Sequence, residues 1–191
     1  MRRLRLLALM TLGAVVLSGC TLVATNPTPV RIPKASDPYS LFNMTIPGTN
    51  NARVRFITQP VYLVDATDHL APSSRIVPSP PALDTVIGQL LLGPTAIETS
   101  AGYTSALPTT MVLISATVRN EVGYFNFATP LSSLPHAQQL LAVGQLVLTA
   151  YDVGATRGIT IKVAGVTQRL LMPSGARSNF VTHGNFQSLL N

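Results

Sequence analysis

Two stretches with a helical repeat of apolar residues, set between pairs of β-rich segments, constrain the fold of this chain more than any other feature. In the first stretch, five apolar residues recur at the three- and four-residue spacing of one helix face: Leu83, Val86, Ile87, Leu90 and Leu91. This spacing predicts an amphipathic helix. Gly93 and Pro94 follow it, and such a pair is typical of the point where a helix ends.

The second stretch spans residues 135–154 and carries the same repeat on six residues: Ala137, Leu140, Leu141, Gly144, Leu148 and Tyr151. It predicts a second helix with one apolar face. Gly144 lies on that face, and its missing side chain would let the helix approach a sheet closely.

Short β-rich runs surround the two predicted helices. Before the first helix they are RVRFI (53–57), VYLVD (61–65) and SSRIVP (73–78), with a turn-like segment at 65–69. Between the helices, residues 109–118 and 122–127 predict a hairpin. The first strand of this hairpin has four apolar residues on one face: Val112, Ile114, Ala116 and Val118.

After the second helix, Ile159, Ile161 and Val163 alternate on one face of a predicted strand, and Ala164-Gly165 forms a tight turn after it. The predicted order is two strands, a helix, two strands, a helix and two strands. Helices that alternate with hairpins in this way favour one mixed or antiparallel sheet covered on one face by helices. We therefore expect an α+β fold, a two-layer sandwich with two helices on one face of the sheet.

The N-terminus has the pattern of a secretory signal. Arg2, Arg3 and Arg5 precede an uncharged, mostly apolar run at residues 6–17. This run is too short to span a bilayer, which takes about 20 residues. A basic start, a short apolar run and small residues at its end are typical of a signal peptide. We expect residues 1–19 to be removed.

The chain contains one cysteine, Cys20. The order Leu17-Ser18-Gly19-Cys20 resembles the lipobox of bacterial lipoproteins. The resemblance implies that the sulfur carries a diacylglyceryl group, that the chain is cut before Cys20, and that the acylated (palmitate-bearing) protein is anchored on the extracytoplasmic side of the cell membrane. The alternatives are a free cysteine within a signal anchor and a catalytic thiol. A catalytic thiol would need neighbours that lower its pKa, and its neighbours here are leader residues.

The segment between the anchor and the first β-rich run has the composition of a linker. Five prolines lie in residues 20–51: Pro27, Pro29, Pro33, Pro38 and Pro47. Proline at this density favours an extended tether. The alternative is that residues 39–47 pack onto the domain as an extra strand. We expect a lipidated cysteine and tether at 20–51, a folded domain at 52–175 and a C-terminal extension at 176–191.

Charge argues against a nucleic-acid partner. The chain has 13 basic and seven acidic residues, a net charge of +6. Removal of residues 1–19 takes away three arginines, so ten basic residues remain against the same seven acids and the net charge falls to +3. The remaining basic residues are scattered along the sequence, whereas nucleic-acid binding needs them clustered on one face.

The sequence offers few groups for catalysis or metal binding. Asp65, Asp68 and His69 lie close together and could form a metal site or an acid–base pair. The alternative is a polar hairpin loop in which an aspartate caps the turn. The sequence has no HExxH motif and no His/Cys set with zinc spacing. We expect no enzyme activity, no metal and no cofactor.

Three motifs, in order, resemble the GerMN domain found in spore-germination lipoproteins and in actinobacterial envelope lipoproteins, some linked to sensor kinases. They are Leu91-Leu92-Gly93-Pro94-Thr95, Ser105-Ala106-Leu107-Pro108 and Gln145-Leu146-Val147-Leu148-Thr149. The resemblance covers roughly residues 54–175. Two departures stand out: Phe125-Asn126-Phe127-Ala128 replaces the family's frequent Val-Asp-Leu-Ser, and Ala164-Gly165 replaces its frequent Asp-Gly.

The resemblance implies a non-enzymatic scaffold or signalling-accessory module of the cell envelope, anchored to the membrane and docked on an envelope or membrane protein. The alternative function is a lipoprotein that binds lipid or a small ligand in an apolar groove. Four aromatic residues could line such a groove or belong to the core: Tyr103, Tyr124, Phe125 and Phe127.

Overall fold

The computed structural model describes residues 54–190. These residues belong to one compact unit that covers residues 52–191. The predicted signal peptide, the lipobox with Cys20, and the tether lie outside the described residues. Among the described residues, none of the helices combines the length and the apolar character that crossing a membrane requires.

The first two strands form a long antiparallel hairpin, β1 (Phe56–Val64) and β2 (Leu70–Pro78). The two β-rich runs predicted at 53–57 and 61–65 belong to the single strand β1, which continues through Pro60. The predicted return strand at 73–78 is confirmed and begins earlier, at Leu70. Val61, Leu63 and Val77 are buried on the inner face of this two-stranded ribbon.

A separate four-stranded mixed sheet has the strand order β3-β4-β5-β6. The β4 and β5 strands run parallel, and the other pairs are antiparallel. The predicted hairpin after β3 and the predicted tight turn after β5 are confirmed: φ is positive at Asn120 and Glu121, and at Ala164 and Gly165, as two-residue hairpin turns require. The strands are β3 (Leu113–Arg119), β4 (Val122–Phe127), β5 (Gly158–Val163) and β6 (Val166–Thr167).

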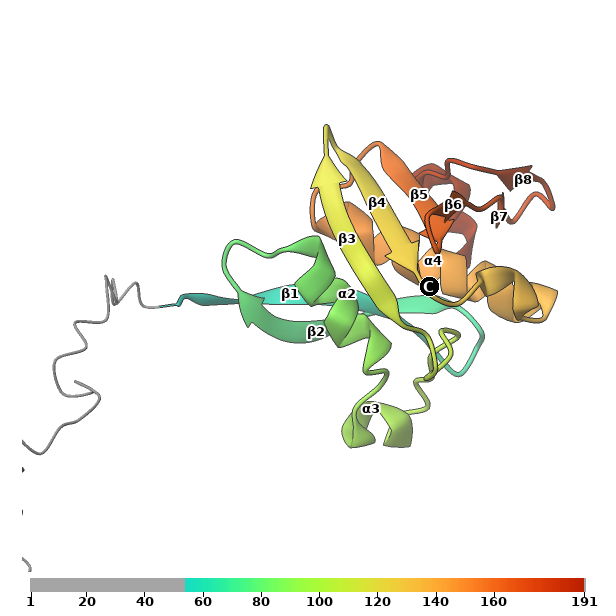
Figure 1. Ribbon diagram of the computed structural model, residues 1–191. Coiled ribbons are helices and arrows are strands. Elements are labelled where there is room, and N and C mark those ends of the chain that lie inside the picture. The colour runs from blue at the N-terminus through green and yellow to red at the C-terminus, as the bar shows by residue number, and fades with distance from the viewer. Residues whose placement is uncertain (1–53, 191) are drawn as a thin grey trace, which may run out of the picture. The chain divides into compact units, whose positions relative to one another are not determined.

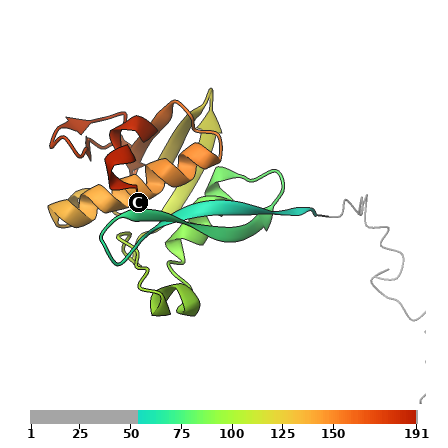
Figure 2. The same ribbon diagram turned by 180° about the vertical axis from the view of Figure 1, so that it is seen from behind.

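Two helices lie on one face of this sheet, and the β1–β2 ribbon packs against both of them (Figures 1 and 2). The helix α2 (Leu83–Leu91) contacts β3 and β1, and α4 (His136–Asp152) contacts β5 and β1. The predicted α+β class, with two helices on one face of a mixed sheet, is confirmed. The first hairpin differs from the prediction because it forms a sheet of its own instead of joining the other strands.

The short elements complete the unit. A one-and-a-half-turn helix, α3 (Ala96–Ser100), follows α2. Near the C-terminus, Val181 bridges to Ile159 on β5, and both Val181 and Phe186 are fully buried. The remaining elements are η3 (Leu131–Ser133), β7 (Leu170–Leu171), β8 (Arg177–Ser178), η4 (His183–Asn185) and η5 (Gln187–Leu189).

The apolar pattern of α2 is confirmed, whereas that of α4 is wrong at its ends. Ala137 and Tyr151 are exposed, while all residues from 142 to 150 are buried. Packing between the ribbon and the sheet buries this helix all round, so a one-sided stripe does not describe it. The close approach at Gly144 is confirmed, because an added Cβ would lie 2.6 Å from Cδ1 of Leu70.

The predicted apolar face of β3 is wrong at two positions. Val112 and Ile114 are exposed, while Ala116 is buried and Val118 half-buried. The register between β3 and β4 shifts between Leu113 and Ser115. This bulge inserts one residue, so Ile114 turns outward and Leu113 packs against the core instead.

Gly158, at the start of β5, provides a test of this packing. Its φ is +139°, and an added Cβ would overlap the carbonyl oxygen of Val181 and the ring of Phe180. We expect Gly158→Ala to lower the free energy of unfolding by about 2–4 kcal/mol, because backbone strain and a backbone clash act together. Thermal unfolding measures the loss. Gly154→Ala is the control, since Gly154 also has a positive φ but nothing lies within 4 Å of its Cβ position. Equal losses for both variants would contradict the packing at Val181.

Candidate functional site

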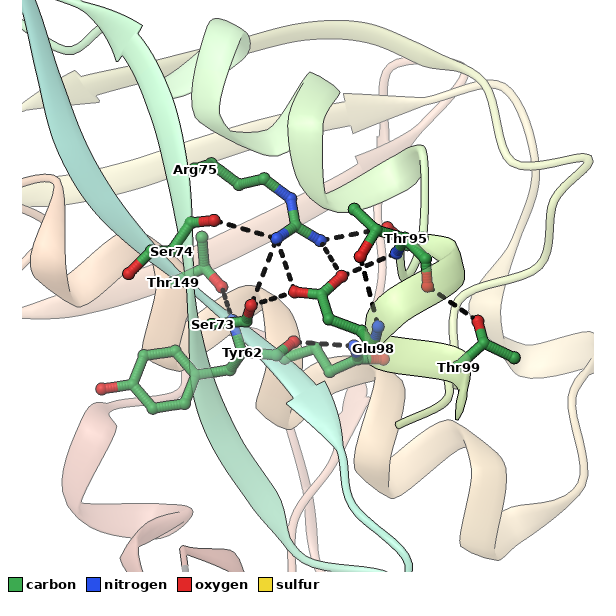
Figure 3. Close-up of polar contacts among 10 residues, drawn as sticks. Tyr62, Ser73, Ser74, Arg75, Thr95, Glu98, Thr99 and Thr149 are labelled. Atoms are coloured by element: carbon green, nitrogen blue, oxygen red, sulfur yellow. Dashed lines mark hydrogen bonds and ion pairs between the residues drawn. The ribbon is translucent and has the colours of Figure 1, made fainter. Parts of the chain in front are cut away.

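The third motif of the resemblance holds helix α4 to two other segments. Gln145 is fully buried, and its side chain donates to the carbonyl oxygen of Tyr62 on β1 (2.8 Å) and accepts from the amide of Ala106 (2.8 Å). One turn later, Thr149 accepts from the Tyr62 amide (3.1 Å, Figure 3). Gln138 donates to the carbonyl of Ala106 (3.0 Å). The second and third motifs are therefore joined by hydrogen bonds to one another.

The first motif leads into a second polar cluster, built around an ion pair between Arg75 and Glu98 (Figure 3). Arg75 lies on the inner side of β2, and its guanidinium donates to both carboxylate oxygens of Glu98, at 2.7 and 2.9 Å. It also donates to the carbonyl of Gly93 (3.2 Å). The two side chains are 9% and 14% exposed, so the pair is largely shielded from water.

Thr95, the last residue of the first motif, caps helix α3 in the same cluster. Its hydroxyl accepts from the Glu98 amide, and the Glu98 carboxylate accepts from the Thr95 amide (2.6 Å), which is a capping box. The Ser73 hydroxyl donates to Glu98 as well. The hydrogen bond from Arg75 is the largest cause that lowers the pKa of Glu98 to about 2, with further contributions from Ser73 and Thr95.

The polar side chains of the three motifs all form hydrogen bonds within these two clusters; they are Thr95, Ser105, Gln145 and Thr149. Among the described residues, no buried side-chain nitrogen or oxygen lacks a hydrogen-bond partner. The motif residues 91–95, predicted as structural, end α2 and begin α3: Leu91 packs against the core, Gly93 has a φ of +74° and Thr95 is the cap.

The loop between β1 and β2 forms the polar hairpin turn, capped by an aspartate, that the sequence predicts as the alternative to a metal or acid–base site. The Asp65 carboxylate accepts from the backbone amides of Thr67 (2.8 Å) and His69 (3.0 Å), so it caps the turn. The ring of His69 lies within hydrogen-bond distance of the hydroxyl and the carbonyl oxygen of Thr67. Within residues 54–190, no group of three or more His, Cys, Asp or Glu side chains could hold a metal ion.

The four aromatic residues considered for a groove divide into two classes. Phe125 and Phe127 are buried and stack on one another, with ring centroids 5.9 Å apart. Tyr103 packs partly buried against the core. Tyr124 points the other way and is 42% exposed. The predicted core role therefore holds for the two phenylalanines, and Tyr124 lies on the opposite, solvent-exposed face of the sheet.

That solvent-exposed face carries an open groove of about 520 Å³ over β3, β4 and β5. Tyr124 lies in the middle of it, with Arg119 and Lys162 among its lining residues. By contrast, a narrow pocket between η3, α4 and β5 has a volume of about 10 Å³. That is about the space of one water molecule and far below the hundreds of Å³ of a ligand cavity.

Comparison with known proteins decides the family. The family model Germane, described as sporulation and spore germination, matches residues 60–169, which is more than half of the chain. The chain belongs to the Germane family. The predicted GerMN resemblance is confirmed, and the Germane region begins within β1 and ends just after β6. A search of curated proteins found no match.

Two of the solved structures that match this chain contain GerMN domains. The tandem GerMN domains of the sporulation protein GerM from Bacillus subtilis match with 12% identity and a TM-score of 0.52, over 67% of this chain and 46% of that chain. The first GerMN domain of the same protein matches with 13% identity and a TM-score of 0.51, over 67% of this chain and 98% of that chain. The chain thus spans about half the length of the tandem structure and nearly all of the single domain.

Sequence reasoning missed the partners of the Germane motifs. The Thr95 to Glu98 spacing is that of a capping box and was a usable signal. Arg75 stands between Ser73 and Val77 at alternate positions of β2, so its burial also follows from strand alternation. Nothing in the sequence pairs Arg75 with Glu98 or brings Arg119 and Lys162 to one sheet face, because these contacts depend on the tertiary fold.

Proposed function

We propose that this chain is a membrane-anchored, extracytoplasmic lipoprotein whose Germane domain acts as a non-enzymatic interaction or signalling-accessory module of the cell envelope. The observation that carries this proposal is that the polar side chains of the three family motifs are occupied in holding the fold together. A domain whose distinctive residues stabilise a rigid scaffold presents its outer surfaces to a partner.

The exposed surface supports an interaction role. Several large apolar side chains stand in solvent on different elements: Phe56, Ile76, Leu92, Ile97, Val112 and Ile114. Membership of a sporulation and germination family agrees with a place in the envelope. The alternative function, ligand binding in an apolar groove, has less support, because the buried aromatic residues fill the core and the open groove is mostly polar.

The anchor is tested by labelling with palmitate. We expect Cys20→Ala to abolish incorporation and to leave the precursor uncleaved, because the sulfur that would form the thioether is gone. The matched control is Ser18→Ala, which removes one hydroxyl two residues away and leaves a small side chain. Labelled bands on gels of whole cells give the readout. Palmitate incorporation into the Cys20→Ala chain would show that the anchor assignment is wrong.

A further inference from the structure

The solvent-exposed face of the mixed sheet has a composition that the motif residues do not explain. Residues opposite one another in adjacent strands share a face. The register therefore places Thr117, Tyr124 and Thr160 in one row across β3, β4 and β5. The next row consists of Ser115, Asn126 and Lys162. All six line the open groove of about 520 Å³.

The groove is lined by hydroxyl and amide groups around one exposed aromatic ring. The side-chain oxygen of Asn126 accepts from the amide of Gly165 (3.1 Å), and Asn126 is one of the residues that line the groove. The lining includes no Asp or Glu. Asn126 and Ala164 are the two positions at which the resemblance implies a frequent aspartate, and this chain has a neutral residue at each. The hydrogen bond between Gly165 and Asn126 lies beside both positions.

Two cations complete the surface. Arg119 and Lys162 line the groove, and within residues 54–190 neither side chain forms an ion pair or a side-chain hydrogen bond. Glu121, in the turn beyond Arg119, is the neighbouring acid and is not part of the lining. Arg119 and Lys162 stand two strands apart and two rows apart, about 16 Å between backbone positions at ~4.8 Å per strand and ~3.3 Å per residue.

The spacing between Arg119 and Lys162 favours an extended ligand over a small anion. A single phosphate or carboxylate is held by donors that converge within hydrogen-bond distance, whereas a ligand that lies along both cations bridges backbone positions about 16 Å apart. The centre of a protein interface is usually apolar and depleted in Ser and Lys, whereas this groove is rich in hydroxyls. A chain of hydroxylated units with spaced negative charges matches the hydroxyl and amide groups, the flat face of Tyr124 and the two cations together.

We propose that this face binds an acidic polysaccharide, laid across β3, β4 and β5 with its negative groups near Arg119 and Lys162 and a sugar ring on Tyr124. This proposal rests on the proposed function in one respect: the anchored chain has to lie in the envelope, where such polymers occur. Binding by the purified chain needs neither the anchor nor a protein partner. Its failure is therefore distinguishable from failure of the palmitate test.

The test measures binding of the full-length chain, in detergent micelles, to immobilised polymers by biolayer interferometry. Polygalacturonate supplies carboxylates and phosphomannan supplies phosphates, while dextran is neutral and polyglutamate is an acidic polypeptide. We expect binding to one or both acidic glycans, weakened by salt, and at least about tenfold weaker binding to dextran and to polyglutamate. Which acidic glycan binds identifies the acid that the groove accepts.

Variants locate the binding on the sheet face. Lys162→Gln and Tyr124→Ala should each weaken glycan binding about tenfold or more, since each removes a charge-assisted hydrogen bond or a stacking surface. Arg55→Gln and Phe56→Ala are matched controls: both side chains are exposed on or beside β1 and lie outside the groove. Absence of glycan binding, equal binding to dextran or polyglutamate, or equal effects of the control variants would each overturn the proposal.

Discussion

Replacing Arg75 with methionine should lower the free energy of unfolding by about 3 kcal/mol at pH 7, because it leaves the Glu98 carboxylate shielded from water without its cation. The two side chains are 9% and 14% exposed, and the guanidinium reaches both carboxylate oxygens. Arg75 also links β2 to the carbonyl of Gly93 at the end of α2. Urea denaturation of a soluble chain that begins at Thr21 measures the loss.

Two further variants make this result specific. Arg55→Met removes an exposed arginine near the same ribbon and should change stability by less than about 0.5 kcal/mol. The double variant Arg75→Met/Glu98→Leu should lose less than the sum of the two single variants, because removing both charges leaves neither one buried alone. A loss below about 1 kcal/mol for Arg75→Met, or strict additivity in the double variant, would contradict the ion pair as a stabilising contact.

The pH dependence gives a second readout of the same pair. Hydrogen bonds from Arg75, Ser73 and Thr95 hold the pKa of Glu98 at about 2 in the folded chain, against an ordinary value of 4.5. The folded state therefore binds the proton less readily than the unfolded state, and the stabilisation is complete above pH 4.5. It is lost as the pH falls toward 2. A pKa shift of this size corresponds to at most about 3 kcal/mol of stabilisation. Partial contact of the carboxylate with solvent reduces this stabilisation to about 2 kcal/mol. Arg75→Met should flatten this acid dependence.

Gln145→Leu should have a comparable effect for a different reason. The substitution keeps the volume of the side chain but leaves the Tyr62 carbonyl and the Ala106 amide without their partner. Each buried group that loses its hydrogen bond costs about 1–3 kcal/mol, so we expect a total loss of about 3 kcal/mol. The same urea denaturation measures it.

The control for Gln145 is Gln187→Leu, an exposed glutamine on η5 near the C-terminus. It should change stability by less than about 0.5 kcal/mol. Hydrogen exchange adds a local readout, since the Ala106 amide should exchange faster in Gln145→Leu than in the parent chain. Unchanged protection of that amide, together with unchanged stability, would contradict the role of Gln145 as the link between the two motifs.

The sequence predicted the helices and hairpins well because their signals are local. The apolar repeat of α2, the stop at Gly93 and the turn at Ala164-Gly165 each depend on neighbouring residues alone. The partition of the strands into a ribbon and a separate sheet was not predictable in this way. Which hairpin joins which sheet depends on the packing of α4 between them, and the same packing buries Gln145 and Thr149.

The candidate site was less predictable than the fold. Arg119 and Lys162 are 43 positions apart and look scattered in the sequence, yet the parallel pairing of β4 with β5 brings them to one groove. Tyr124 and Phe125 were both among the four aromatic residues considered for a groove or the core, but strand alternation places their two rings on opposite faces. The bulge at Ile114 likewise has no clear local signal in the sequence.

The central claim is that the anchored domain works by docking within the envelope. Crosslinking the acylated protein in intact membranes, followed by its purification and mass spectrometry, tests this claim most directly. The proposed function predicts that a specific envelope or membrane protein is recovered with the parent chain and lost with Cys20→Ala. Recovery of no specific protein, together with co-purified lipid, would contradict the docking role and favour a lipid-binding lipoprotein instead.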